Sequence, residues 1–129
     1  MITVVGIKTQ SPDFTIGTIQ DVVAYCDTKI ELAVDTETEG LDFTSDKMIM
    51  FQIGDEEQQF VIDTRVVSIE PLRDILERRN TLKLLQNAKF DYKFMAHVMA
   101  MLMLPYLMEQ GMKSDDYKNF MEQKHKKFN

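Results

Sequence analysis

The segment Glu31–Asp42, which reads ELAVDTETEGLD, joins an apolar strand to a dense group of carboxylates. Its first half, Glu31–Thr36, is typical of a β-strand, and its second half, Glu37–Asp42, is typical of an acidic turn. Residues i and i+2 of a strand point to the same face. Asp35 and Glu37 are therefore expected to present two carboxylates at one sheet edge, which suits a hard cation such as Mg²⁺ or Mn²⁺. Taken alone, an Asp-x-Glu pair is more often a solvated strand end than a metal site.

The hydrophobic pattern on either side of this segment predicts the remaining elements. The predicted strands are Met1–Ile7, Lys47–Ile53, Gln58–Ile62 and Leu82–Leu85. One helix is predicted at Thr18–Tyr25. A second helix is predicted to have Ser68 as its N-cap and Pro71 in its first turn, and to end near Arg79. Short connections indicate antiparallel hairpins in the middle of the chain, and the strand–helix–strand order that follows indicates a parallel neighbour. The expected fold class is α/β, a mixed sheet with helices packed on it.

Length, composition and charge are those of one globular domain. The chain has 129 residues and a single cysteine, Cys26, which suits a reducing compartment. It has no apolar stretch of the kind that a signal peptide or a membrane span needs, so a cytoplasmic location without a membrane partner is expected. The net charge is −6, but residues 1–63 carry −10 and residues 64–129 carry +4. This asymmetry fits an acidic metal site beside a basic phosphate-binding surface, or simply a mixed solvated surface.

A second candidate motif is Leu84–Asp91, which reads LLQNAKFD. The predicted strand delivers Gln86 and Asn87 to its end, and Asp91 falls in the first turn of the helix that follows. In isolation this pattern indicates an ordinary helix start, because an aspartate there interacts favourably with the helix dipole and Asn87 can act as the cap.

Together, Ala33–Asp42 and Gln86–Asp91 resemble the first two motifs of the DEDD exonuclease superfamily. The resemblance is closest to the proofreading 3′→5′ exonuclease domain of family A (polymerase I type) DNA polymerases, many of them in phages, and it covers roughly residues 1–95. It implies a ribonuclease H-like fold over residues 1–129 as a single domain, with a shortened helical C-terminal part. It also implies two-metal hydrolysis, with Mg²⁺ or Mn²⁺, at the 3′ end of single-stranded DNA in a bacterial or phage-infected cell.

The resemblance assigns a role to each matching residue. Asp35 corresponds to the aspartate that bridges both metals, Glu37 to the glutamate that holds the water-activating metal, and Asp91 to the aspartate that supports the other metal. The residues that match nucleic-acid-binding positions are Thr36, Thr38, Leu41, Gln86, Asn87 and Phe90, with Leu41 at the place of the apolar wedge against the terminal base.

The third family motif, Tyr-x-x-x-Asp, does not follow Asp91 in this sequence. We therefore expect an incomplete domain that is weak or inactive by itself, with a DNA polymerase or a second chain as the candidates that could complete it. The residues that could replace the missing ligand are Asp115, Asp116, Glu122 and His125, although all four also fit ordinary helix ends. Two alternatives remain: a non-catalytic module that holds a 3′ terminus, and a regulatory subunit of a replication complex that docks through the methionine-rich segment Met95–Met121, which is more typical of a core.

Overall fold

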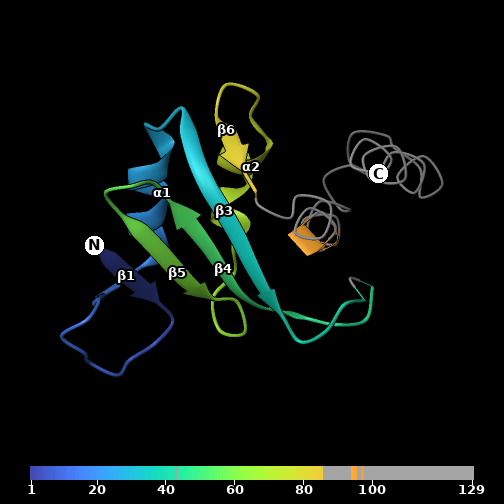
Figure 1. The fold of residues 1–129 in the computed structure, drawn as a ribbon, viewed down its shortest axis with the longest axis horizontal. Coiled ribbons are helices and arrows are strands. Elements are labelled where there is room, and N and C mark those ends of the chain that lie inside the picture. Colours follow the sequence, from blue (N-terminus) through green and yellow to red (C-terminus); the bar gives the residue numbers. More distant parts are fainter. Residues whose placement is uncertain (43, 86–93, 96, 98–129) are drawn as a thin grey trace.

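A single mixed sheet organises the part of the chain that the structure describes. This computed structural model describes residues 1–42, 44–85, 94, 95 and 97. Within them, six strands are arranged in the order β2-β1-β5-β4-β3-β6. Figure 1 labels all of these strands except β2. The strands are β1 (Ile2–Val5), β2 (Thr15–Gly17), β3 (Glu31–Thr38), β4 (Met48–Gly54), β5 (Gln59–Asp63) and β6 (Leu82–Leu84). The predicted α/β class with a mixed sheet is confirmed.

Strand directions agree with the connection lengths in the sequence. β3, β4 and β5 pair as consecutive antiparallel hairpins, and β6 returns to pair parallel with β3. β1 pairs parallel with both β5 and β2. The sequence pattern did not predict β2, because three residues are too few to show an alternation of apolar and polar side chains. This strand exists because β1 offers it a free edge.

The first helix, α1 (Ile19–Asp27), begins at a capping box. The amide of Asp21 donates to Thr18 Oγ1 (3.2 Å), and the amide of Thr18 donates to Asp21 Oδ2 (2.8 Å). These two bonds satisfy backbone donors that a helix start leaves without partners. Thr18, which was predicted as the first helical residue, is therefore the N-cap, and the helix runs two residues past the predicted Tyr25.

The prediction of one continuous helix from Ser68 to Arg79 is wrong. The chain forms a 3₁₀ turn, η1 (Glu70–Leu72), and then a five-residue helix, α2 (Arg73–Glu77). Ser68 Oγ does accept the amide of Glu70 (3.1 Å), but the N-cap position belongs to Ile69. α2 stops early because Arg78 adopts an extended backbone and turns the chain toward β6.

None of the helices in the described part of the chain has the length and apolar character that a membrane span needs.

The helices cover one face of the sheet, and that face holds the core. Side chains of β3, β4 and β5 pack there against α1, η1 and α2, and the buried members include Val22, Cys26, Leu32, Val34, Phe51, Ile53, Ile62, Leu72 and Ile75. Burial raises the pKa of the Cys26 thiol to about 12, so this free cysteine behaves as a small apolar side chain. The opposite face of β3 carries exposed side chains.

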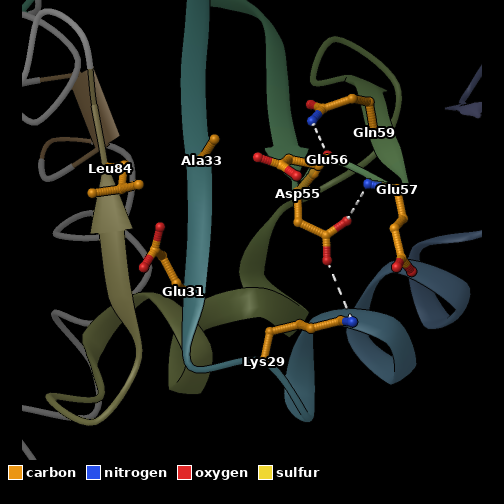
Figure 2. A pocket seen from close by; sticks show the side chains of 9 residues that line it. Lys29, Glu31, Ala33, Asp55, Glu56, Glu57, Gln59 and Leu84 are labelled. Atoms are coloured by element: carbon orange, nitrogen blue, oxygen red, sulfur yellow. Dashed lines mark hydrogen bonds and ion pairs between the residues drawn. The ribbon is translucent and has the colours of Figure 1, made fainter.

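A polar network closes the turn between β4 and β5. Tyr25 Oη donates to the Asp55 carboxylate (2.7 Å to Oδ1), and Lys29 Nζ lies 3.3 Å from Asp55 Oδ2. The Asp55 carboxylate also accepts the amides of Glu57 and Gln58, each at 3.0 Å. Figure 2 shows Lys29 and Asp55 pointing toward each other beside the hollow at this end of the sheet. The network ties α1 to the β4–β5 hairpin.

Replacing Gly54 by alanine should destabilise the protein by about 1–3 kcal/mol, the usual cost of overpacking. A Cβ at Gly54 would contact the backbone oxygen of Gln58 and lie 2.9 Å from the Cα of Gln59, and neither can move without distorting the hairpin. Urea denaturation of the variant and the wild type measures the difference. Gly40→Ala is the matched control, because the nearest atoms to its added Cβ belong to the end of the Asp46 side chain and not to the backbone. Equal losses in the two variants would contradict this account.

The stability of the protein should fall in acid partly through Asp55. The Tyr25 hydroxyl, with smaller help from the amides of Gln58 and Glu57 and from Lys29, lowers the pKa of the Asp55 carboxyl to about 2. Because this folded-state pKa lies below the unfolded value of about 3.9, the stabilisation is complete above about pH 4 and disappears as the pH falls toward 2. Unfolding free energies measured from pH 5 to pH 2 should show a shallower decline in Asp55→Asn. An unchanged decline in that variant would remove Asp55 from the explanation.

Candidate functional site

Strand alternation in β3 separates the acidic side chains from the core. Leu32, Val34 and Thr36 are buried on the helix-covered face, whereas Asp35 and Glu37 are exposed on the opposite face. Both carboxylates therefore stand on one side of the sheet, as expected for residues two positions apart. Among the described residues, neither forms an ion pair. Two exposed carboxylates close together, without an ion-pair partner among the described residues, form an acidic strip toward the end of β3.

A β-bulge lies directly beside Glu37. In the β3–β4 ladder Glu37 pairs with Met50, but Thr38 pairs with Met48, so Ile49 is an extra residue on β4. Bulges turn side chains and are frequent next to functional sites. Thr64, the residue after β5, forms hydrogen bonds to the backbone at the bulge. Its Oγ1 donates to the Met48 carbonyl (2.7 Å), and its amide donates to the Ile49 carbonyl (3.0 Å).

The Asp35 side chain is oriented by its own strand. Its Oδ1 accepts the backbone amide of Thr36 (2.9 Å), and Gln52 is its cross-strand partner on β4. The Thr36 side chain itself is only 6% exposed and faces the core. A nucleotide contact by Thr36 therefore remains a prediction that concerns its backbone.

The connection from β3 to β4 presents Leu41 to solvent. Thr38 Oγ1 donates to the Gly40 carbonyl (2.7 Å), which directs this hydroxyl into the loop. The amide of Glu39 donates to the Lys47 carbonyl (2.9 Å), and the amide of Lys47 donates back to Glu39 Oε1 (3.1 Å). With the base of the loop fastened in this way, the Leu41 side chain stays 85% exposed. An exposed leucine on a fastened loop is available for an apolar contact.

A hollow of about 900 Å³ opens at this same end of the sheet. It lies between the start of β4, the turn after β5 and the helical residues Phe94 and His97. Its charged and hydroxyl-bearing lining residues are Glu39, Thr44, Ser45, Asp46, Lys47, Thr64, Arg65 and His97. Arg65 forms a two-bond ion pair with Asp63 (2.9 and 3.0 Å), and this hydrogen bonding lowers the pKa of the Asp63 carboxyl.

Some of the predicted site residues lie outside the described part of the chain. These are Gln86, Asn87, Phe90 and Asp91, and the candidate replacement ligands Asp115, Asp116, Glu122 and His125. Among the described residues, no group of three histidine, cysteine, aspartate or glutamate side chains gathers as a metal site would require. The described donors, two carboxylates on one exposed face, are of the chemical type that Mg²⁺ and Mn²⁺ prefer.

The sequence pattern missed the supporting residues of this edge. Gln52, Thr64 and the bulge at Ile49 are defined by cross-strand neighbours, and a linear pattern contains no information on which residues oppose each other. The only available signal was the continuous apolar character of Lys47–Ile53, which predicts a strand and says nothing about its irregularity.

Comparisons with known proteins identify similar sequences and folds. The model of a family described as 3′-5′ exonuclease matches residues 15–115. DNA polymerase I of Aquifex aeolicus is 42% identical over 65 residues, which are 50% of this chain and 10% of that polymerase.

Solved structures show the same fold at low sequence identity. Brucella melitensis NrnC with bound Mg²⁺ aligns with a TM-score of 0.54 at 20% identity, covering 75% of this chain and 43% of NrnC. Escherichia coli RNase D, an exoribonuclease involved in structured RNA processing, aligns with a TM-score of 0.55 at 21% identity, covering 62% of this chain and 22% of RNase D. The chain thus spans less than half the length of each of these proteins. On the family match, this chain belongs to the 3′-5′ exonuclease family, among the DEDD exonucleases related to DNA polymerase I.

Proposed function

We propose that this domain takes the 3′ end of single-stranded DNA at the edge formed by Asp35, Glu37 and Leu41, and that it supports metal-dependent hydrolysis of the terminal phosphodiester there. The observation that carries the proposal is the exposure of Asp35 and Glu37 side by side on one face of β3, next to the bulge. Because the chain belongs to the 3′-5′ exonuclease family, we expect the reaction at this acidic edge to be hydrolysis of a phosphodiester at a 3′ end.

The residues that would hold the metal ions are Asp35, Glu37 and Asp91. When bound, divalent cations neutralise charge on the scissile phosphate and make a bound water more acidic. Carboxylates are the protein's own contribution, because hard oxygen ligands suit Mg²⁺ and Mn²⁺. The Asp35 carboxylate is already oriented by the Thr36 amide (2.9 Å), which reduces the freedom lost when a ligand binds.

The path of the chain supports a place for Asp91 near this edge. β6 runs parallel to β3 and pairs with Glu31–Ala33, so the chain leaves β6 heading in the same direction as Asp35. After the stretch that is not described, Phe94 is buried in the core, and His97 lines the hollow at the end of β3. Asp91 itself belongs to the stretch that the structure does not describe, and its place at this edge is part of the proposal.

The proposed contacts to the nucleotide are based on the family pattern and on which side chains are exposed. Leu41 is well placed to press against the terminal base, because its side chain is 85% exposed at the tip of a fastened loop. Thr36 and Thr38 would contribute backbone groups, since the Thr38 hydroxyl is already bonded to Gly40. Gln86, Asn87 and Phe90 complete the proposed pocket.

DNA is the proposed substrate and a DNA polymerase the proposed partner, because a relative that is 42% identical over 65 residues is a DNA polymerase. A second chain that completes the site is the alternative partner. RNA is the competing substrate, since RNase D aligns with the fold. A second candidate function for these 129 residues assayed alone is a module that holds a 3′ terminus without cleaving it, because they contain the first two motifs and no Tyr-x-x-x-Asp.

The first prediction of the proposal concerns stability and metal. In chelator, Asp35→Asn and Glu37→Gln should unfold within about 0.5 kcal/mol of the wild type or be slightly more stable, because exposed groups contribute little. With Mn²⁺ at a hundred times its dissociation constant, the wild type should gain about 2.7 kcal/mol, and Asp35→Asn should gain much less. Thermal unfolding with and without Mn²⁺ measures both effects. Glu31→Gln, an exposed acid at the other end of β3, is the control and should gain as much as the wild type.

The second prediction concerns turnover. With Mg²⁺ and a 5′-labelled single-stranded DNA, the chain should bind the 3′ end and shorten it stepwise. When these 129 residues are assayed alone, the rate should be roughly 10²-fold below that of a relative that has the third motif, because they contain no Tyr-x-x-x-Asp to orient the water. Asp35→Asn should bind without shortening, and Glu31→Gln should behave like the wild type. Binding without any shortening by the wild type would select the holding module, whereas equal shortening by Asp35→Asn would refute the assigned site. An RNA strand of equal sequence, run in parallel, tests the substrate.

A further inference from the structure

The residue that fixes the bulge beside Glu37 belongs to neither family motif. Thr64 follows β5 and makes two hydrogen bonds to consecutive carbonyls of β4: its hydroxyl to Met48 (2.7 Å) and its amide to Ile49 (3.0 Å). Carbonyls at a bulge are partly excluded from the regular ladder and need another donor when they are shielded from water. Thr64 supplies that donor twice.

The turn that carries Thr64 is itself held firmly. The amides of Val66 and Val67 donate to the Asp63 carbonyl (3.2 and 3.0 Å). The amide and guanidinium of Arg65 donate to the Asp63 carboxylate at 2.9–3.0 Å. Because this turn is held by several hydrogen bonds, the Thr64 hydroxyl keeps the start of β4 in a fixed position relative to the end of β5.

Glu37 is the residue that this position affects most directly. It pairs with Met50, the last regular pair before the register shift, and Thr38 pairs with Met48 on the other side of the extra residue, Ile49. If β4 lost this bulge, Thr38 would pair with Ile49 in place of Met48, and the β4 side chains before Met50 would turn to the opposite face. Glu37 forms the pair next to this shift, so the course of β3 at Glu37 depends on where Met48 and Ile49 are held.

We propose that Thr64 is a positioning residue for the Glu37 carboxylate: by holding the Met48 and Ile49 carbonyls, it keeps the bulge in place and keeps Glu37 directed at the metal-binding edge. This role rests on the proposed function, in which Glu37 holds a divalent cation. Thr64 touches neither the substrate nor the metal in this proposal and acts only through β4.

The test compares Thr64→Val, which keeps the shape of the side chain but removes the hydroxyl, with Thr64→Ser, which keeps the hydroxyl. Titration calorimetry with Mn²⁺ and amide NMR spectra of the metal-free protein are the two measurements. Supporting groups of this kind usually change metal affinity by roughly 10–100-fold. Thr64→Val should therefore weaken Mn²⁺ binding by about tenfold or more, and it should shift the amide signals of residues 37–38 and 48–50. Thr64→Ser should restore both to wild-type values.

Thr81→Val is the matched control. Thr81 is buried and donates its hydroxyl to the Lys29 carbonyl (3.1 Å) near the opposite end of β3, so its replacement removes the same kind of bond far from Glu37. Its Mn²⁺ affinity should equal that of the wild type even if its stability falls. If Thr64→Val does not fold, Thr64→Ala takes its place, because it also removes the hydroxyl. Thr64→Ala should weaken Mn²⁺ binding and shift the same amide signals.

The outcomes separate this role from the proposed function. If the wild type binds Mn²⁺, Asp35→Asn does not, and Thr64→Val binds as tightly as the wild type, then the positioning role is overturned and the metal site stands. If Thr81→Val weakens binding as much as Thr64→Val, the effect is a general loss of stability and the positioning role is again overturned. If the wild type does not bind Mn²⁺, both the role and the proposed metal site fall together.

Discussion

The pairing of β3 with β4 is the constraint on which the site depends. It places Val34 opposite Ile53 and Thr36 opposite Phe51, and all four side chains are buried under the helices. Asp35 and Glu37 then have to face the other way, because side chains alternate along a strand. A slip of one residue would bury both carboxylates and expose the apolar residues, at a cost of several kcal/mol for each unpaired charge. The hydrophobic effect on one face therefore determines where the acidic groups lie on the other.

The two ends of the sheet are built differently. At the β4–β5 turn, Tyr25, Lys29 and two backbone amides surround Asp55, so every charge in that network has a partner. At the end of β3, the regular ladder gives way to a bulge and an exposed loop that carries Leu41. Closed networks contribute stability, and open edges with exposed groups are what a ligand can contact. The fold thus pairs the charged groups around Asp55 at one end of the sheet and leaves Asp35, Glu37 and Leu41 exposed toward the other end.

Acidic side chains serve different purposes in this fold. The Asp55 carboxylate accepts a hydrogen bond from the Tyr25 hydroxyl and the Asp63 carboxylate accepts hydrogen bonds from Arg65, and these bonds lower the pKa of each carboxyl. Asp35 and Glu37 form no ion pair with any described residue and stand on an exposed strand face. This contrast separates carboxylates that hold the fold together from carboxylates that a metal ion could neutralise. It could not be read from the sequence, where all four are aspartate or glutamate near the end of a strand.

The sequence by itself determined the α/β class, most of the strands, the hairpins and the same-face placement of Asp35 and Glu37, because each of these follows from local periodicity and from connection length. The segment ELAVDTETEGLD, together with Gln86–Asp91, also carried the resemblance to the DEDD exonucleases that the family match confirms. Only the tertiary structure decided the short strand β2, the division of the Ser68–Arg79 segment into η1 and α2, and the bulge held by Thr64. These features arise from contacts between residues that are distant in the chain, such as a free edge on β1 or a hydroxyl near two carbonyls of another strand. A pattern of neighbouring residues has no means of recording such contacts.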